Sequence, residues 1–419
     1  MSFLRRVAGS FGQSQGVGSD SHWLARALGG GKTHAGASVS EYTALNITAV
    51  YSAVGILADL LGMLPLRVYQ RDGERRSLVQ DHPLVPALGG QANEYMTSFT
   101  LRQTSQGHAS LWGNGYIEVE KNNKGEAVSL WPLLPDCTHP YRNQSGADSG
   151  IRYRTQLDGQ SFSLPPDRVV HIKSFGHDGY CGLSPIALHR QALGMALATE
   201  EFGAKFFGND AKSGGFLTHP GTLGDDAQKR LAESMNKKSG LDKAHRVRVL
   251  EEGMKFHQTT IPPEDAQFLG TREFQIAEIA RIFRVPLVLL QSHEKSTAWG
   301  TGIEQFIIGF RSFTLQPWVR CWEDELNTKL FTASERSKGL EVRFALNELA
   351  RGDLQSRAAY LEKLMQMGAI TPDEVRIEEG YNPKDGLLDR HFISTNLRDM
   401  SEPDPNAEAS RAMRNALSE

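Results

Sequence analysis

Apolar positions recur every three or four residues in several long segments of the chain, which is the spacing of an amphipathic helix. The first such segment covers residues 47–61, and its stripe is Ile47, Val50, Tyr51, Val54, Leu57, Ala58 and Leu61. Pro65 ends this helix, because a proline cannot continue helical hydrogen bonding. Further helices are expected over residues 98–111, 184–207, 263–284, 303–331, 353–368 and 371–380. Pro317 should kink the helix over 303–331.

Short segments between the first helices alternate between apolar and polar residues, which is typical of strands. They cover residues 66–70, 116–120, 127–133, 151–157 and 169–172. Asp72-Gly73 gives the turn at 71–74 the signature of a hairpin, and residues 122–125 form the next turn. We therefore expect residues 40–183 to be an α+β block with an antiparallel sheet, within a helix-rich chain.

The helix over 184–207 begins with Ser184-Pro185, a strong helix start, and is dense in small residues. Small side chains let a neighbouring helix approach closely, either inside the same domain or in another subunit; the sequence leaves both open. The helix over 263–284 carries an apolar stripe at Ile276, Ile279, Ala280 and Phe283. The residues expected to pack these two helices are Ala192, Ala196, Gly203, Ile276, Ile279 and Phe283.

Charge is balanced over the 419 residues, with 46 Lys and Arg against 49 Asp and Glu and a net charge of -3. This excludes a protein that grips nucleic acid by neutralising phosphates along its whole surface. Residues 212–257 look like a separate small insertion and hold nine Lys and Arg against six Asp and Glu. Such a local surplus usually marks a solvated face, and a docking surface is the less common explanation.

Three cysteines, Cys137, Cys181 and Cys321, lie far apart and outside any CxxC pair. This pattern is typical of a reduced, intracellular protein without a disulfide framework or zinc site. The most apolar stretch, residues 49–64, is interrupted by Ser52 and Asp59 and is too short for a membrane span. We expect no membrane partner.

Candidate catalytic chemistry is weak, and we expect no catalytic, cofactor-binding or metal-binding residues. Gly29-Gly30-Gly31-Lys32-Thr33 lacks the earlier glycine of a phosphate-binding loop, since position 26 is an arginine. His171, His177 and Cys181 fit no usual zinc spacing. Two acidic groups are better explained by a helix start and by a solvated helix face than by catalysis; they are Glu264-Asp265 and Glu323-Asp324-Glu325.

A series of short sequence motifs, occurring in a fixed order along the chain, carries a family resemblance. They are Ala49-Val50-Tyr51, Leu64-Pro65-Leu66-Arg67-Val68-Tyr69, Asp81-His82-Pro83-Leu84, Leu111-Trp112-Gly113-Asn114-Gly115-Tyr116, Trp131-Pro132-Leu133, Val170-His171-Ile172-Lys173, Gly182-Leu183-Ser184-Pro185 and Glu278-Ile279-Ala280-Arg281-Ile282-Phe283-Arg284-Val285-Pro286. In this order the chain resembles the portal proteins of tailed bacteriophages, specifically those of long-tailed phages. The family often has Pro-Asn before its Met-Thr step, whereas Met96-Thr97 follows Asn93-Glu94-Tyr95 here.

The resemblance implies an organisation in nine segments. They are a flexible arm (1–39), a wing (40–183), a stem helix (184–211), a clip (212–258), a second stem helix (259–290), a tunnel loop (291–302), a kinked long helix with a wing strand (303–347), a crown (348–385) and a flexible tail (386–419). It implies channel-facing residues in the tunnel loop, namely Ser292, His293, Glu294, Lys295, Ser296, Thr297 and Trp299. In the clip it implies docking residues, for which we select Lys229, Arg230, Lys237 and Lys238.

The implied function is a ring, usually of twelve subunits, at one vertex of the capsid. Double-stranded DNA passes through its channel without sequence recognition during packaging and ejection. The implied partners are the terminase, then the head–tail adaptor, and the major capsid protein. The implied location is the virion, with the host cytoplasm during assembly. Two alternatives stay open: a nucleic-acid-processing enzyme, such as a metal-dependent nuclease or nucleotide hydrolase, and a non-viral multimeric adaptor or secretion ring.

Overall fold

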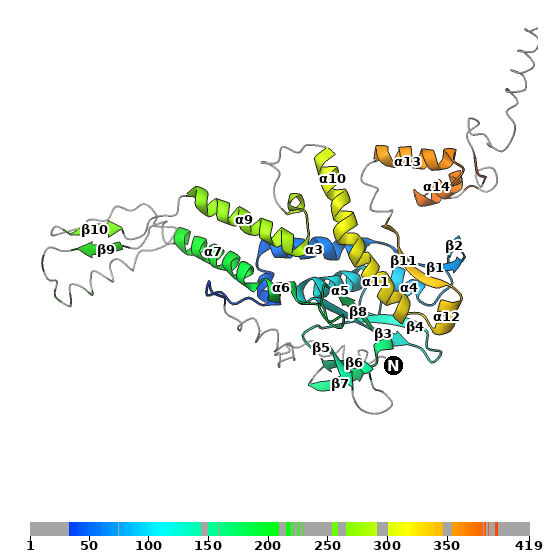
Figure 1. Cartoon of the computed structure of the whole chain (residues 1–419), viewed down its shortest axis with the longest axis horizontal. Coiled ribbons are helices and arrows are strands. Elements are labelled where there is room, and N and C mark those ends of the chain that lie inside the picture. Colours follow the sequence, from blue (N-terminus) through cyan, green and yellow to red (C-terminus); the bar gives the residue numbers. More distant parts are fainter. Residues whose placement is uncertain are drawn as a thin grey trace, which may run out of the picture. The chain divides into compact units, whose positions relative to one another are not determined.

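The computed structural model describes residues 33–73, 75–143, 150–157, 159–208, 215–218, 254–258, 265–290, 301–346 and 354–379, with isolated residues between 221 and 229 and between 381 and 392. The chain divides into two compact units, residues 1–344 and 345–419, and each is described by itself. Figure 1 shows the order of their elements.

The longer helices of the first unit lie close to the segments that the apolar periodicity predicts, whereas the short helices α2, α4 and α12 were not predicted. They are α2 (Glu41–Ala44), α3 (Thr48–Met63), α4 (Val85–Gly89), α5 (Ser98–Trp112), α6 (Pro185–Leu188), α7 (Arg190–Gly208), α9 (Asp265–Phe283), α10 (Thr301–Phe310), α11 (Gln316–Lys329) and α12 (Ala333–Ser337). In α3 the predicted stripe is buried except for Tyr51, whose side chain is exposed. The α3 helix ends at Met63, two residues before Pro65.

Over the residues described above, the strands of the first unit form four small sheets. They are β1 (Leu66–Asp72), β2 (Arg75–Leu78), β3 (Asn114–Lys121), β4 (Ala127–Leu133), β5 (Thr138–Asn143), β6 (Gly150–Leu157), β7 (Gln160–Leu164), β8 (Val169–Lys173), β9 (Gly215–Thr218), β10 (Lys255–Gln258) and β11 (Leu340–Phe344). The strand orders are β11-β1-β2, β4-β3-β8, β5-β6-β7 and β10-β9. Every pairing is antiparallel, so the mixed α+β architecture predicted from the sequence is confirmed.

Every residue of the edge strand β2 is exposed, including Arg75 and Arg76. It pairs only with β1 in this sheet. The Arg76 guanidinium reaches across to Glu341 of β11 at 2.7 Å. Charged side chains of this kind are a common feature of exposed sheet edges.

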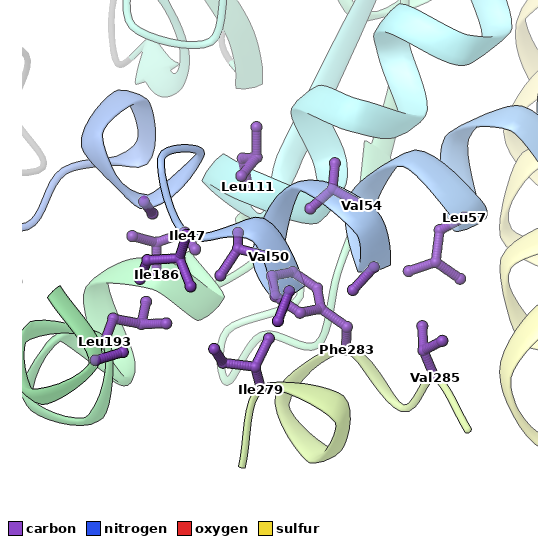
Figure 2. Close-up of a cluster of buried hydrophobic side chains, with 14 of the residues drawn as sticks. Ile47, Val50, Val54, Leu57, Leu111, Ile186, Leu193, Ile279, Phe283 and Val285 are labelled. Atoms are coloured by element: carbon purple, nitrogen blue, oxygen red, sulfur yellow. The ribbon is translucent and has the colours of Figure 1, made fainter. Parts of the chain in front are cut away.

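One apolar core joins α3 to the helices α6, α7 and α9. Figure 2 shows Val50 of α3 on the same side as Ile279 and Phe283 of α9 and Leu193 of α7, while Val54 lies beside Leu111 of α5. These side chains come from parts of the chain more than 200 residues apart, and burying them fixes α7 and α9 against the rest of the unit.

The expected helix over 184–207 is two helices in the structure. Ser184 is the N-cap of α6, where its hydroxyl oxygen accepts from the backbone N–H of Ala187 at 3.1 Å, as the sequence predicts. His189 then leaves the helical conformation, with φ -104° and ψ 22°, and α7 begins at Arg190. The apolar periodicity continues through this break, which is why the sequence pattern did not reveal it.

The long helix after residue 300 is interrupted by a π-helical segment, Arg311–Leu315, between α10 and α11. Pro317 lies in the first turn of α11. A proline removes one backbone donor and collides with the carbonyl four residues earlier, and the wider π turn relieves both problems. The irregularity therefore precedes Pro317 instead of lying at it.

Residues 33–38, at the end of the expected arm, lie against α7. The Thr33 side chain is buried and fills the space beside Gly194. The backbone N–H of His34 donates to the side chain of Gln191 at 3.0 Å. Residues 1–32 of the arm lie outside the described residues.

The described part of the second unit contains two helices, α13 (Leu354–Gln366) and α14 (Pro372–Glu378). Thr371 caps α14 through a capping box with Glu374. Both helices match sequence expectations. Within the described part of the chain, no helix combines the length and the hydrophobicity that crossing a bilayer requires.

Candidate self-association surface

Three of the family-like sequence motifs meet around Asn114, at the start of β3. Its side-chain oxygen accepts from the backbone N–H of Gly182 at 2.8 Å, and its side-chain N–H donates to the Gly182 carbonyl at 2.8 Å. The same oxygen lies 2.9 Å from Nε2 of His171. Gly113 has a left-handed backbone with φ 77°, and a Cβ there would overlap the Leu183 carbonyl. These three segments therefore form a close-packed structural junction.

His171 is held in this junction as a neutral side chain. Its Nδ1 lies 3.2 Å from the Tyr153 hydroxyl, so both ring nitrogens have partners. Burial lowers its pKa well below the usual value, and Lys173 and Lys329 lower it further. Burial also raises the pKa of the Cys181 thiol. Among the residues that the structure describes, no three His, Cys, Asp or Glu side chains gather as a metal site.

The acidic run of α11 has three separate partners. Glu323 is buried, contacts Arg343 at 2.9 Å and accepts from the backbone N–H of Phe344 at 2.9 Å. Asp324 pairs with Arg320 at 3.1 Å, and Glu325 accepts from the backbone N–H of His171. Glu323 is thus a buried anchor for β11, not part of a solvated face as the sequence suggested. Glu264 lies outside the described residues.

The inner faces of α7 and α9 contain most of the predicted stem residues. Ala196, Gly203, Ile279 and Phe283 are buried, while Ala192 and Ile276 are half-buried. Ala196, Ile279 and Phe283 belong to the chain's own core. These three side chains therefore pack within one subunit.

The outer faces of α7 and α9 carry a second set of apolar side chains. Met195 and Phe202 of α7 and Phe274 of α9 are each about half exposed or more. Met195, Ala198 and Phe202 are spaced as one helix face. The two helices are joined by a hydrogen bond from Gln275 to the Thr199 hydroxyl at 3.0 Å. We call the residues Met195, Ala198, Phe202 and Phe274 the outer stem face.

Sequence reasoning missed the outer stem face. The spacing of Met195, Ala198 and Phe202 is present in the sequence, but α7 is apolar on two sides, and periodicity alone does not say which side lies inside. A helix with two apolar faces is normally covered on both. The outer stem face is therefore a candidate surface for association with other copies of the chain.

The remaining predicted functional residues are not positioned. The channel-loop residues 292–297 and 299 lie outside the described residues, as do Arg230, Lys237 and Lys238 of the insertion. Lys229 is described and exposed. Strands β9 and β10, which follow α7 and precede α9, pair in antiparallel fashion at the base of the insertion.

Comparison with known proteins agrees with the family resemblance that the sequence motifs indicate. The family model described as phage portal protein matches residues 48–380. The portal protein of Enterobacteria phage HK97 is 32% identical over 352 residues, which cover 83% of this chain and 82% of the relative. The probable portal protein of Streptomyces phage phiC31 is 34% identical over 388 residues, covering 88% and 82%.

Solved structures share the fold. A portal protein of the HK97 phage family from Corynebacterium diphtheriae aligns with a TM-score of 0.55 and 16% identity, covering 75% of this chain and 98% of the other. A chain in the neck of a native gene transfer agent particle, computed with C12 symmetry, aligns with a TM-score of 0.51 and 21% identity, covering 86% and 99%. The family match spans most of the chain, and both curated relatives exceed 30% identity over more than four-fifths of it. The chain belongs to the phage portal protein family.

Proposed function

We propose that the chain assembles into a closed ring of about twelve copies at one capsid vertex and forms the conduit for double-stranded DNA in packaging and ejection. The observation that carries the proposal is the second apolar face of α7, with Met195 and Phe202 exposed opposite the buried Leu193. A ring formed by rotation uses two different faces of each subunit, and exposed apolar helix faces suit such contacts.

The charge of the chain supports passage of DNA instead of retention. The net charge of -3 leaves no general surplus of Lys and Arg. Each phosphate contact that releases a counterion strengthens binding, so a strongly basic channel would hold the DNA. Lys295 in the proposed channel loop would contact phosphates without reading bases.

The same proposal assigns partners to segments. The insertion, residues 212–258, would dock the terminase and later the head–tail adaptor, using Lys229, Arg230, Lys237 and Lys238. Reversing these four charges should weaken terminase affinity and leave the melting temperature unchanged. Unchanged affinity would remove these four residues from the docking surface. The wing would contact the major capsid protein in the virion.

Native mass spectrometry combined with electron microscopy tests the ring. We expect closed rings near a dozen times the 46.3 kDa of one chain. A chain that stays monomeric at high concentration would refute the proposal.

No contact in the described residues favours the alternative of a metal-dependent nuclease or nucleotide hydrolase. Such an enzyme needs carboxylates that converge on one ion, whereas Glu323, Asp324 and Glu325 have different partners. Metal-dependent turnover that disappears in Glu323→Gln and Asp324→Asn variants would support the enzyme instead.

A further inference from the structure

Helix α10 has large apolar side chains that the rest of the first unit leaves exposed. The exposed fractions are 57% for Phe306 and 48% for both Ile307 and Ile308, and Phe313 in the π-helical segment is 78% exposed. Figure 1 shows α10 extending away from α3 and α9. The α10 segment contains a single charged residue, Glu304.

The exposed residues continue the chain's own core outwards. At about 100° per residue, Phe306, Ile307 and Phe310 share one face of α10. Phe310 is buried in the core that α7 and α9 also enter. One end of this stripe is thus covered and the other, at Phe306 and Ile307, is not. We call Phe306 and Ile307 the α10 stripe.

The size of the exposed patch indicates a partner. A large apolar side chain contributes on the order of 100–200 Å² when it is exposed, so Phe306, Ile307 and Phe313, which lie on one side of the helix, together expose roughly 300 Å². This is within the range of the largest patch on a typical monomer, roughly 300–600 Å², and is a substantial share of the roughly 800 Å² that each partner contributes to a standard interface. Ile308 lies about 100° from Ile307, so α10 presents apolar surface on more than one side.

We propose that the α10 stripe is covered by a second copy of this chain, so that α10 extends the core of one subunit into its neighbour. The inference rests on the proposed ring. A heterologous contact joins two different faces of each copy, and the outer stem face and the α10 stripe are two different exposed apolar faces. DNA does not fit as the occupant, because an uncharged apolar stripe offers phosphates no donor or cation. Continuity with the core through Phe310 favours a protein that itself presents apolar helix faces.

Assembly of a charged variant tests the inference. The Phe306→Asp variant and the Ile307→Asp variant should each shift native mass spectra of the full chain from rings to monomers, raising the concentration for half-assembly at least tenfold. Their circular dichroism should match that of the wild type, because both side chains are already exposed. The matched control is Leu78→Asp on β2, where the exposed fraction is also 48%, and it should assemble normally.

Several outcomes would overturn the inference. Rings at the wild-type concentration in both α10 variants would do so, and so would an equal loss of assembly in the Leu78→Asp control. A wild-type chain that forms no ring would refute the proposed function itself. If the wild type forms rings and both α10 variants do so equally well, only the inference about the α10 stripe is refuted.

Cross-linking identifies the occupant directly. A photoreactive benzoylphenylalanine at position 306, in full chains mixed from light and heavy isotope labels, should give cross-links between differently labelled copies. Cross-links only within one copy, including to residues 1–32 or 345–419, would show that the chain covers its own α10 stripe and would overturn the inference.

Discussion

The hydroxyl of Thr314 donates a hydrogen bond to the backbone carbonyl of Arg284 at 2.8 Å. Thr314 is buried in the π-helical segment, and Arg284 directly follows Phe283, the last residue of α9. This bond links the end of α9 to the π-helical segment that follows α10. The position of the irregular turn in the long helix is thus coupled to the end of the stem helix α9.

Replacing Thr314 with valine should therefore destabilise the fold. Valine keeps the shape of the side chain but cannot donate to the Arg284 carbonyl, so we expect a loss of about 1 kcal/mol in the free energy of unfolding. Denaturant unfolding of dispersed subunits measures it. Thr328→Val is the control, since that hydroxyl bonds to the Asp324 carbonyl on an exposed helix face and should cost less than about 0.5 kcal/mol. Equal effects of the two variants would argue against a special role for the Thr314 bond.

Arg284 should be more favourable as glycine. It has a left-handed backbone with φ 55°, while Val285 N–H bonds to the Ala280 carbonyl and Arg284 N–H to the Arg281 carbonyl, which is the Schellman arrangement. Relief of about 1–2 kcal/mol of left-handed strain exceeds the roughly 0.5–1 kcal/mol entropic cost of glycine. Arg284→Gly should thus raise the melting temperature, and Arg284→Ala should not. A lower melting temperature for the glycine variant would mean that the arginine side chain itself stabilises this turn.

Gly113→Ala should disrupt the junction around Asn114. The added Cβ would meet the Leu183 carbonyl, so the cost should exceed about 3 kcal/mol and lower the yield of folded chain. Gly125→Ala provides a matched control, because Gly125 has nearly the same φ of 80° but open space around it, and should cost only about 1–2 kcal/mol. Similar losses in thermal unfolding for the two variants would show that backbone strain, and not the junction, determines the effect.

Glu118 should make stability depend on pH. It is 1% exposed, neither carboxylate oxygen has a hydrogen-bond partner, and Arg168 lies 3.8 Å away. Burial raises the pKa of Glu118, nearby Glu120 raises it further, and Arg168 opposes the shift. The folded state therefore binds more protons than the unfolded state between the ordinary and the raised pKa, and stability falls as the pH rises through this window.

Glu118→Gln removes the charge, so its melting temperature should exceed that of the wild type at pH 7, and the difference should shrink at pH 4. Thermal unfolding at both pH values measures this. A difference that is constant or larger at pH 4 would contradict the raised pKa.

Deletion of residues 294–299 should leave ring formation intact and impair DNA translocation or retention. The reason is that the proposed channel loop contacts DNA and is not assigned to subunit contacts. Native mass spectrometry reports assembly, and a DNA packaging assay reports passage. A deletion variant that cannot assemble would contradict the assignment of this segment.

The helices were predictable because their apolar periodicity is local. The stripes of α3 and α9 identify helices whose buried residues include Val50, Val54, Ile279 and Phe283. Strands β5 and β7 were missed because they depend on their partner: β5 contains Pro140, β7 is mostly polar, and each pairs with β6. The alternation over 116–120 predicts a strand with one polar face, but β3 is the central strand of its sheet, so Glu118 is buried as well.

The candidate site was only partly predictable. The inner residues Ile279 and Phe283 follow from spacing, whereas the outer stem face and the α10 stripe depend on which apolar side the rest of the fold covers. The place where the long helix becomes irregular also depends on how backbone hydrogen bonds rearrange before Pro317, which no residue pattern encodes. The clip and channel-loop assignments came from the family resemblance and stay predictions.

The arginines of β2 have a consequence for the free subunit. A neighbouring chain that tried to extend the β11-β1-β2 sheet by strand addition would have to bring its backbone against two guanidinium groups, one of them paired with Glu341. Zipper-like aggregation through this edge is thereby discouraged while newly made chains accumulate, which leaves them available for ordered, side-chain-directed encounters.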